Sequence, residues 1–110
     1  MSDIISIDDT KIGIGTSTPS TLLQLEGSEP YLTLKNTDND ADGAKLKFVK
    51  DKGAAGATDD VAGLIEFSAD NAIQQEVLFS EIKSQVKVAT DGQEGGKLTL
   101  SVAEHDGTST

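Results

Sequence analysis

The residue types that could support chemistry are concentrated in one acidic stretch, DNDADG, at residues 38–43. It matches the first half of a calcium-binding loop, in which alternate carboxylates converge on a hard cation and a glycine permits a sharp bend. Asp38, Asp40 and Asp42 would be the ligands. The second half of the pattern is missing, because the twelfth position, which needs a bidentate glutamate, is Val49. We expect a solvated hairpin loop, with a weak Ca²⁺ site as the alternative and no other cofactor.

Two further motifs lack the partners that their chemistry needs. His105 is the only histidine, and its neighbours Glu104 and Asp106 would point to the face of a strand opposite to His105. A histidine pair for a metal is therefore excluded. Gly13 and Gly15 superficially suggest a phosphate loop, but a third glycine, a Lys-Ser/Thr pair and a following helix are all missing. We expect a solvated histidine and a structural turn.

Carboxylate pairs for glycoside hydrolysis depend on spacing in the fold, and 19 acidic residues make some close pair inevitable. A sugar ring, however, needs aromatic side chains to stack on, and the chain has three Phe, one Tyr and no Trp. We therefore expect no catalytic residues and a noncatalytic protein.

The chain that must position these residues is small. With 110 residues, few aromatic rings and ten alanines, one domain with a thin core is expected. Such a domain usually needs an additional source of stability, and the absence of cysteine excludes disulfides and thiolate metal sites. Oligomerisation is the remaining common solution.

Charge excludes two classes of partner. The net charge is −10 and there is no arginine, so both the phosphate backbone of nucleic acids and an anionic membrane surface would be repelled. No apolar run approaches the roughly 20 residues that span a bilayer. The N-terminus, MSDIISIDD, has no basic region and no cleavage site, so we expect no signal peptide and synthesis in a cytoplasm.

Apolar and polar residues alternate with period 2 along most of the chain, which is typical of half-buried strands. One segment, residues 69–89, is ambiguous. Asp70 or Asn71 could cap a helix near residues 72–78, but the longer alternation favours a strand over residues 77–90. The other predicted strands are residues 4–7, 11–14, 22–26, 31–35, 45–50, 64–68 and 97–102.

The turn residues between these strands complete an all-β prediction with little helix. The strongest is the hairpin turn at residues 91–96, DGQEGG. The stretch KIGIGTSTPSTLLQLEG, residues 11–27, predicts strand, tight turn and strand, because Gly13 and Gly15 give the backbone freedom and Pro19 prevents a helix.

The order of the motifs resembles that of bacteriophage tail-fibre proteins. The similarity begins with GIGTSTP at residues 13–19 and continues with PYLTLKNT at 30–37 and GLIEF at 63–67. An I-x-x-x-V strand at 82–86 and GKLTLSV at 96–102 follow. Each motif is short, so the similarity rests on their order, which covers residues 12–102.

The resemblance implies a homotrimeric fibre, in which strands of three chains intertwine as a triple-stranded β-helix or a β-prism. Residues 1–27 would be a shaft-like strand-turn-strand segment, and residues 28–110 a fibre or knob segment that is truncated or continues in a longer protein. The implied function is that of a virion structural component that projects or supports host receptor binding. Its partners would be its own copies and other virion proteins, with a host cell-surface glycan as a further candidate. A capsid decoration or head-fibre protein and a monomeric carbohydrate-binding β-sandwich are the alternatives.

Overall fold

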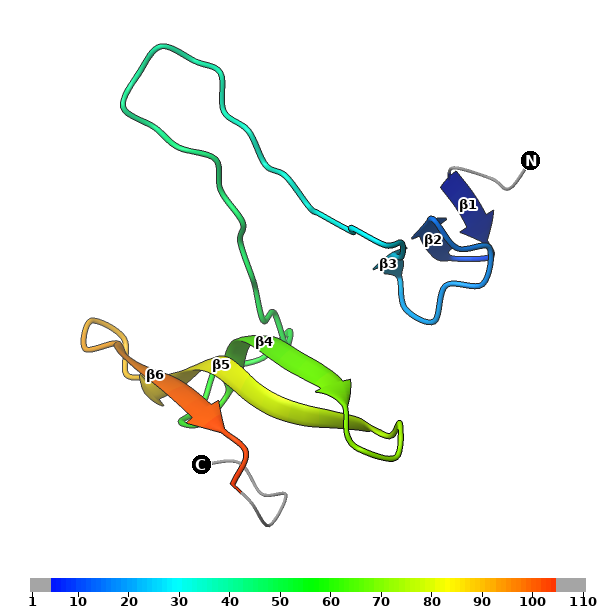
Figure 1. The fold of residues 1–110 in the computed structure, drawn as a ribbon. Helices are drawn as coiled ribbons and strands as arrows, with labels where there is room; N and C mark the ends of the chain where they lie inside the picture. Colours follow the sequence, from blue (N-terminus) through cyan, green and yellow to red (C-terminus); the bar gives the residue numbers. More distant parts are fainter. Residues whose placement is uncertain (1–4, 105–110) are drawn as a thin grey trace. The chain divides into compact units, whose positions relative to one another are not determined.

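A computed structural model describes residues 5–104, and the chain within this range forms six strands and no helix (Figure 1). The prediction of an all-β chain is thus confirmed. No helix in the described range is long and apolar enough to cross a membrane. The strands are β1 (Ile5–Asp8), β2 (Lys11–Ile14), β3 (Leu23–Leu25), β4 (Val61–Asp70), β5 (Glu76–Val88) and β6 (Gly95–Val102).

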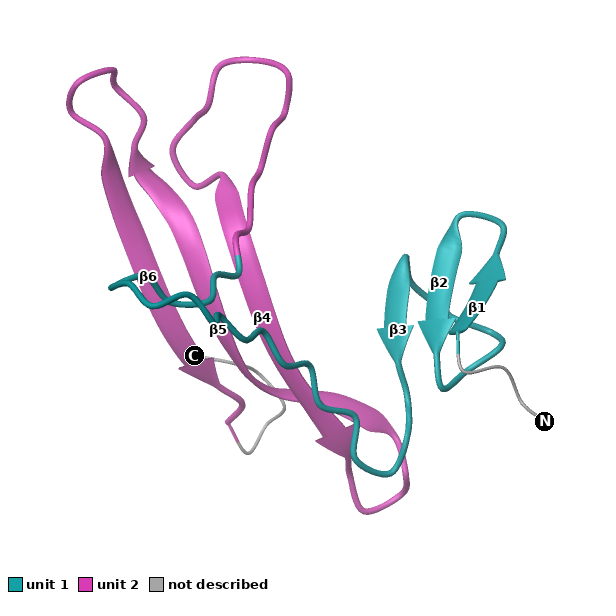
Figure 2. Cartoon of the chain, turned by 90° about the horizontal axis from the view of Figure 1, so that it is seen from above, with its two compact units in different colours: residues 1–46 teal, residues 47–110 magenta. Residues whose placement is uncertain are grey.

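The chain divides into two compact units between Leu46 and Lys47 (Figure 2). Each unit contains one three-stranded sheet, β1-β2-β3 in the first and β4-β5-β6 in the second. The division predicted from the sequence, between residues 27 and 28, is based on the end of the shaft-like motif and not on compact units. It stays a prediction.

In the first unit, β2 is the central strand. It pairs antiparallel with β1 and parallel with β3, with Ile12 opposite both Ile7 and Leu23. The parallel pairing requires the chain to loop back across the sheet, and residues 15–22 do this. The predicted strand-turn-strand over residues 11–27 is confirmed.

Two glycines allow this loop to lie close to the sheet. Gly15 has φ +86°, the left-handed region, and a side chain there would overlap the backbone oxygen of Glu26. A side chain at Gly13 would overlap the backbone oxygen of Thr16 and approach Pro19 Cδ at 3.3 Å. Gly13 and Pro19 are buried as a result.

The second unit is an antiparallel meander of longer strands. Ile65 of β4 lies opposite Ile82 of β5, which lies opposite Leu100 of β6. Gly92, with φ +79°, shapes the turn between β5 and β6, where Gln93 N donates to Thr90 O at 2.9 Å. The predicted hairpin and the predicted long strand are both confirmed.

The helix considered near residues 72–78 does not form. Asn71 Oδ1 does accept hydrogen bonds from the backbone amides of Ile73 and Gln75, as a helix cap would. However, Gln74 has φ +62°, and the Asn71 amide donates to Gln75 O at 2.9 Å, so the chain reverses into β5. The cap-like side chain stabilises a tight turn between two strands.

The strands predicted at residues 31–35 and 45–50 are absent, and this part of the prediction is wrong for the single chain. Residues 32–35 and 44–50 make no backbone hydrogen bond to any other described residue. Alternation reports which side chains seek burial, whereas a strand also needs a neighbouring strand to satisfy its amides and carbonyls. Within residues 5–104 of one chain, these segments have no such neighbour.

The described chain also lacks a hydrophobic core. Among residues 5–104, no Ala, Val, Ile, Leu, Phe or Tyr is buried, and the buried residues are Gly13, Pro19, Ser6 and Ser101. Alternating sequences place their apolar residues on one side of each sheet, and a folded sheet normally covers that side with another layer. The candidate functional site is therefore the apolar side of each sheet, which no second layer covers.

Candidate functional site

One face of the β4-β5-β6 sheet is apolar and exposed. Because directly opposed residues share a face, the register places Ile65, Ile82 and Leu100 in one row and Ser84 and Leu98 in the adjacent row. Leu98 is 69% exposed and Leu100 is 71% exposed. We call this the second-sheet apolar face. Its apolar residues and glycine include Gly63, Ile65, Phe67, Ile82, Val86, Leu98 and Leu100, and Ser80 and Ser84 are its polar members.

The opposite face of the same sheet is mainly polar. Glu66, Glu81 and Ser101 form one of its rows, and Leu64, Lys83 and Thr99 form the next. Lys83 Nζ lies 3.6 Å from Glu81 Oε1. A sheet that is polar on one side and apolar on the other is built to face solvent on one side only.

The first sheet shows the same asymmetry. Ile5, Ile7, Ile12, Ile14, Leu23 and Leu25 share one face by register, and we call this the first-sheet apolar face. Ile5 is 60% exposed and Ile7 is 76% exposed. The other face carries Ser6 and Gly13, both buried under the 15–22 loop. The covered face is thus the polar one, and the face that should form a core is open.

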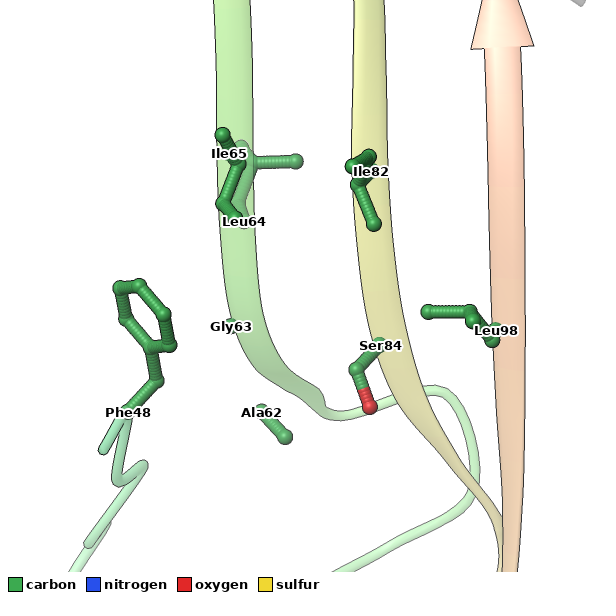
Figure 3. Close-up of a pocket in the computed structure, with 8 residues that line it drawn as sticks. All are labelled: Phe48, Ala62, Gly63, Leu64, Ile65, Ile82, Ser84 and Leu98. Atoms are coloured by element: carbon green, nitrogen blue, oxygen red, sulfur yellow. The ribbon is translucent and has the colours of Figure 1, made fainter. Parts of the chain in front are cut away.

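A hollow of about 270 Å³ on the second-sheet apolar face is lined mainly by apolar side chains (Figure 3). Phe48 lies beside Gly63 at one side, and Leu98 lies at the other. A side chain at Gly63 would come within 2.9 Å of Phe48 Cβ, so the glycine makes room for the ring. Ser84 contributes the single side-chain oxygen. This lining suits an aliphatic side chain and offers no set of groups for acid–base or nucleophilic chemistry.

The predicted calcium ligands do not converge in this structure. Within the described part of the chain, no three acidic or histidine side chains form a group that could hold a metal ion. Asp40 Oδ1 accepts a hydrogen bond from the Asp42 amide at 3.1 Å, and Asn36 Oδ1 accepts one from the Asp38 amide at 2.8 Å. These are the local side-chain bonds of a solvated loop. Calcium binding by Asp38, Asp40 and Asp42 stays a prediction.

The remaining sequence candidates have no shared site. His105 and Asp106 lie outside the described residues. Gly13 and Gly15 serve the close packing of the 15–22 loop described above. Tyr31, the single tyrosine, is 83% exposed.

A carboxylate closes the loop that precedes β4. Asp60 Oδ2 accepts hydrogen bonds from the Ala57 amide at 2.8 Å and from Lys52 Nζ at 3.0 Å. The Ala57 amide and the Lys52 ammonium lower the pKa of Asp60. The Asp59 amide donates to Val86 O at 2.8 Å, and Val86 N donates to Asp60 O at 2.9 Å, so the loop end extends the pairing of β4 with β5.

This arrangement predicts an acid-sensitive loop. Because the pKa of Asp60 is lowered in the folded chain, its stabilisation is complete above the ordinary carboxylate pKa of about 4 and is lost as the pH falls through the lowered folded value. The Ala57 amide proton signal, followed by NMR titration, should shift below about pH 4. In Asp60→Asn this step should disappear, whereas Asp70→Asn, at the far end of β4, should retain it. An unchanged titration in Asp60→Asn would contradict this assignment.

Comparison with models of protein families, with curated proteins and with solved structures found no match for this chain. The candidate site is therefore supported by the geometry of the two sheets alone. Sequence reasoning identified the alternating strands, but it did not identify the two exposed apolar faces as the site. The sequence does contain a signal for these two faces, namely strict alternation in a chain that has few large apolar residues to form a core.

Proposed function

We propose that this chain is a noncatalytic structural segment of a phage virion, a homotrimeric tail-fibre segment. The observation that carries the proposal is that no Ala, Val, Ile, Leu, Phe or Tyr in residues 5–104 is buried, together with one exposed apolar face on each sheet. Exposed apolar faces of this extent mark association surfaces, because leaving them in water forfeits the main driving force of folding.

The partner that suits both faces is a further copy of the same chain. A symmetric oligomer brings the same patch of each copy to a common axis, so the apolar rows of one sheet cover those of the next. Three such sheets around a threefold axis make a prism whose core is built from all chains. The net charge of −10 disfavours nucleic acid and anionic membranes as the cover. The resemblance to tail fibres supports three copies in particular.

In this proposal the protein acts mechanically. Strands that share one core along an axis form a stiff rod, and the rod projects a receptor-binding part located elsewhere in the virion. The mainly polar face of the β4-β5-β6 sheet would form the solvent surface of that rod. The apolar hollow beside Phe48 would receive a side chain of a neighbouring copy.

The mass of the purified chain in solution tests this proposal. Light scattering after size exclusion should give about three times the chain mass of 11.5 kDa, with and without EDTA. The thermal midpoint should rise with protein concentration, because folding and association are coupled. A well-folded monomer would contradict the proposal and would favour a sandwich-type binding module. A trimer that dissociates in EDTA would assign calcium to the loop of residues 38–43.

A further inference from the structure

Residues 45–50, KLKFVK, form a strand-like segment without a strand partner. None of their amides or carbonyls bonds to another residue in the described range. Leu46 is 62% exposed and Phe48 is also exposed. Lys45 and Lys47 make no ion pair or hydrogen bond with any residue that the structure describes. A segment of this kind has both its backbone and its side chains available for pairing.

Among the described residues, the outer strands of the two sheets are β1, β3, β4 and β6, and they differ in length and charge. Strands β1 and β3, with four and three residues, are too short to pair with a six-residue segment. Strand β6 has eight residues, and its single charged residue is Lys97, which would repel a basic segment. Strand β4 has ten residues, including Glu66 and Asp70, and contains no cation.

The acids of β4 lack cations to balance them. Glu66 lies directly opposite Glu81, and Asp70 lies directly opposite Glu76 on β5. Like charges in opposed positions destabilise a sheet. Lys83 pairs with Glu81, but no described cation forms an ion pair with Glu66 or Asp70. A basic strand laid along the outer edge of β4 would supply the missing charge.

The alternation of the segment also matches that of β4. Lys45 and Lys47 alternate with Leu46 and Phe48, as Glu66 alternates with Ile65 and Phe67. Pairing with the lysines on the Glu66 side places Leu46 and Phe48 on the second-sheet apolar face. Within one chain Phe48 already lies beside Gly63 on β4, but only through its side chain (Figure 3).

We propose that residues 45–50 of one copy add as a fourth strand to the outer edge of β4 in a second copy, with Lys45 and Lys47 beside Glu66. This inference rests on the proposed function, because it requires self-association. The added strand satisfies the free backbone groups of the segment and of β4, and it widens the second-sheet apolar face. It also removes an exposed edge that would otherwise recruit unrelated strands.

Zero-length cross-linking tests this pairing on the native chain. Unlabelled and ¹⁵N-labelled chains are unfolded, mixed and refolded together, and native mass spectrometry verifies mixed-isotope assemblies. A carbodiimide then joins lysines to adjacent carboxylates. We expect cross-links from Lys45 or Lys47 to Glu66 or Asp70, with mixed-isotope pairs as abundant as same-isotope pairs.

The outcomes separate this inference from the proposed function. A monomeric mass would overturn the proposed function and the inference with it. A verified trimer whose Lys45 and Lys47 cross-links to β4 carry one isotope only, or are absent, would overturn strand addition between copies and leave the trimer intact.

A charge reversal supplies an independent readout. Lys45→Glu combined with Lys47→Glu should raise the concentration at which the assembly half-dissociates by roughly tenfold or more, because like charges then meet at β4. Adding Glu66→Lys should recover much of this loss. Lys97→Glu, on β6, is the matched control and should leave assembly nearly unchanged. A double variant that assembles like the parent chain would contradict the inferred pairing.

Discussion

If the proposed trimer forms, Leu100→Asp is expected to abolish its assembly. In the single chain Leu100 is 71% exposed, so an aspartate there meets water and disturbs β6 little. In the proposed trimer the same position lies in the shared core, where an unpaired carboxylate costs several kcal/mol. Every copy carries the substitution, so the penalty is repeated in each chain. Light scattering should show a fall from about three times 11.5 kDa to the mass of one chain.

The neighbouring position provides the control. Thr99 lies opposite Lys83 on the mainly polar face, so Thr99→Asp adds the same charge to the same strand but beside a cation. This variant should remain assembled. Leu100→Ala offers a graded comparison, since it removes apolar contact area without adding a charge and should weaken assembly less than the aspartate. An assembled Leu100→Asp chain would show that this face does not form a shared core.

The substitution Gly15→Ala is expected to unfold the first sheet. Gly15 has φ +86°, where an alanine is disfavoured by about 1–2 kcal/mol. The new methyl group would also overlap the backbone oxygen of Glu26, whose amide donates to Ile14 O at 2.9 Å. Relieving the overlap displaces β3 from β2. We expect total destabilisation of roughly 3–5 kcal/mol, which a three-stranded sheet of short strands cannot absorb.

NMR spectra can follow this change residue by residue. Amide signals from β2 and β3 should lose their dispersion in Gly15→Ala, and the thermal transition should broaden or fall. Gly27→Ala is the matched control, because a side chain at Gly27 would meet no atom within 4 Å. Its effect should stay within roughly 0.5–1 kcal/mol. Equal stability of the two variants would contradict the role assigned to Gly15.

Sequence periodicity located most of the strands because period-2 alternation is a local property. It placed the C-terminal end of β1 and both ends of β2 and β3 within one residue, and it favoured strand over helix for β5. Residue 4, where the first predicted strand begins, lies outside the described residues. The turn residues were equally informative, since Gly92 adopts the positive φ that the predicted hairpin requires. For the Asn71 turn the local signal was ambiguous, because the same side-chain bonds cap a helix or close a turn, and the positive φ of Gln74 decides between them.

Pairing between distant segments required the tertiary structure. Residues 31–35 and 45–50 alternate as clearly as β4 or β6, yet they have no strand partner in the part of the chain that the structure describes. Alternation records a preference of side chains, whereas hydrogen bonding in a sheet depends on which backbone lies alongside. The same limit applies to the acidic loop, where the spacing of Asp38, Asp40 and Asp42 did not make their carboxylates converge in the fold.

The sequence by itself determined that this chain is all-β, acidic, free of cysteine and poor in large core residues. It also determined which residues of each strand share a side. Only the tertiary structure decided that both apolar sides remain open and that the covered side of the first sheet is the one with Ser6 and Gly13. The physical reason is that one side of a sheet becomes buried only when a second layer of structure covers it. The local preferences of the residues do not specify whether that layer belongs to the same molecule.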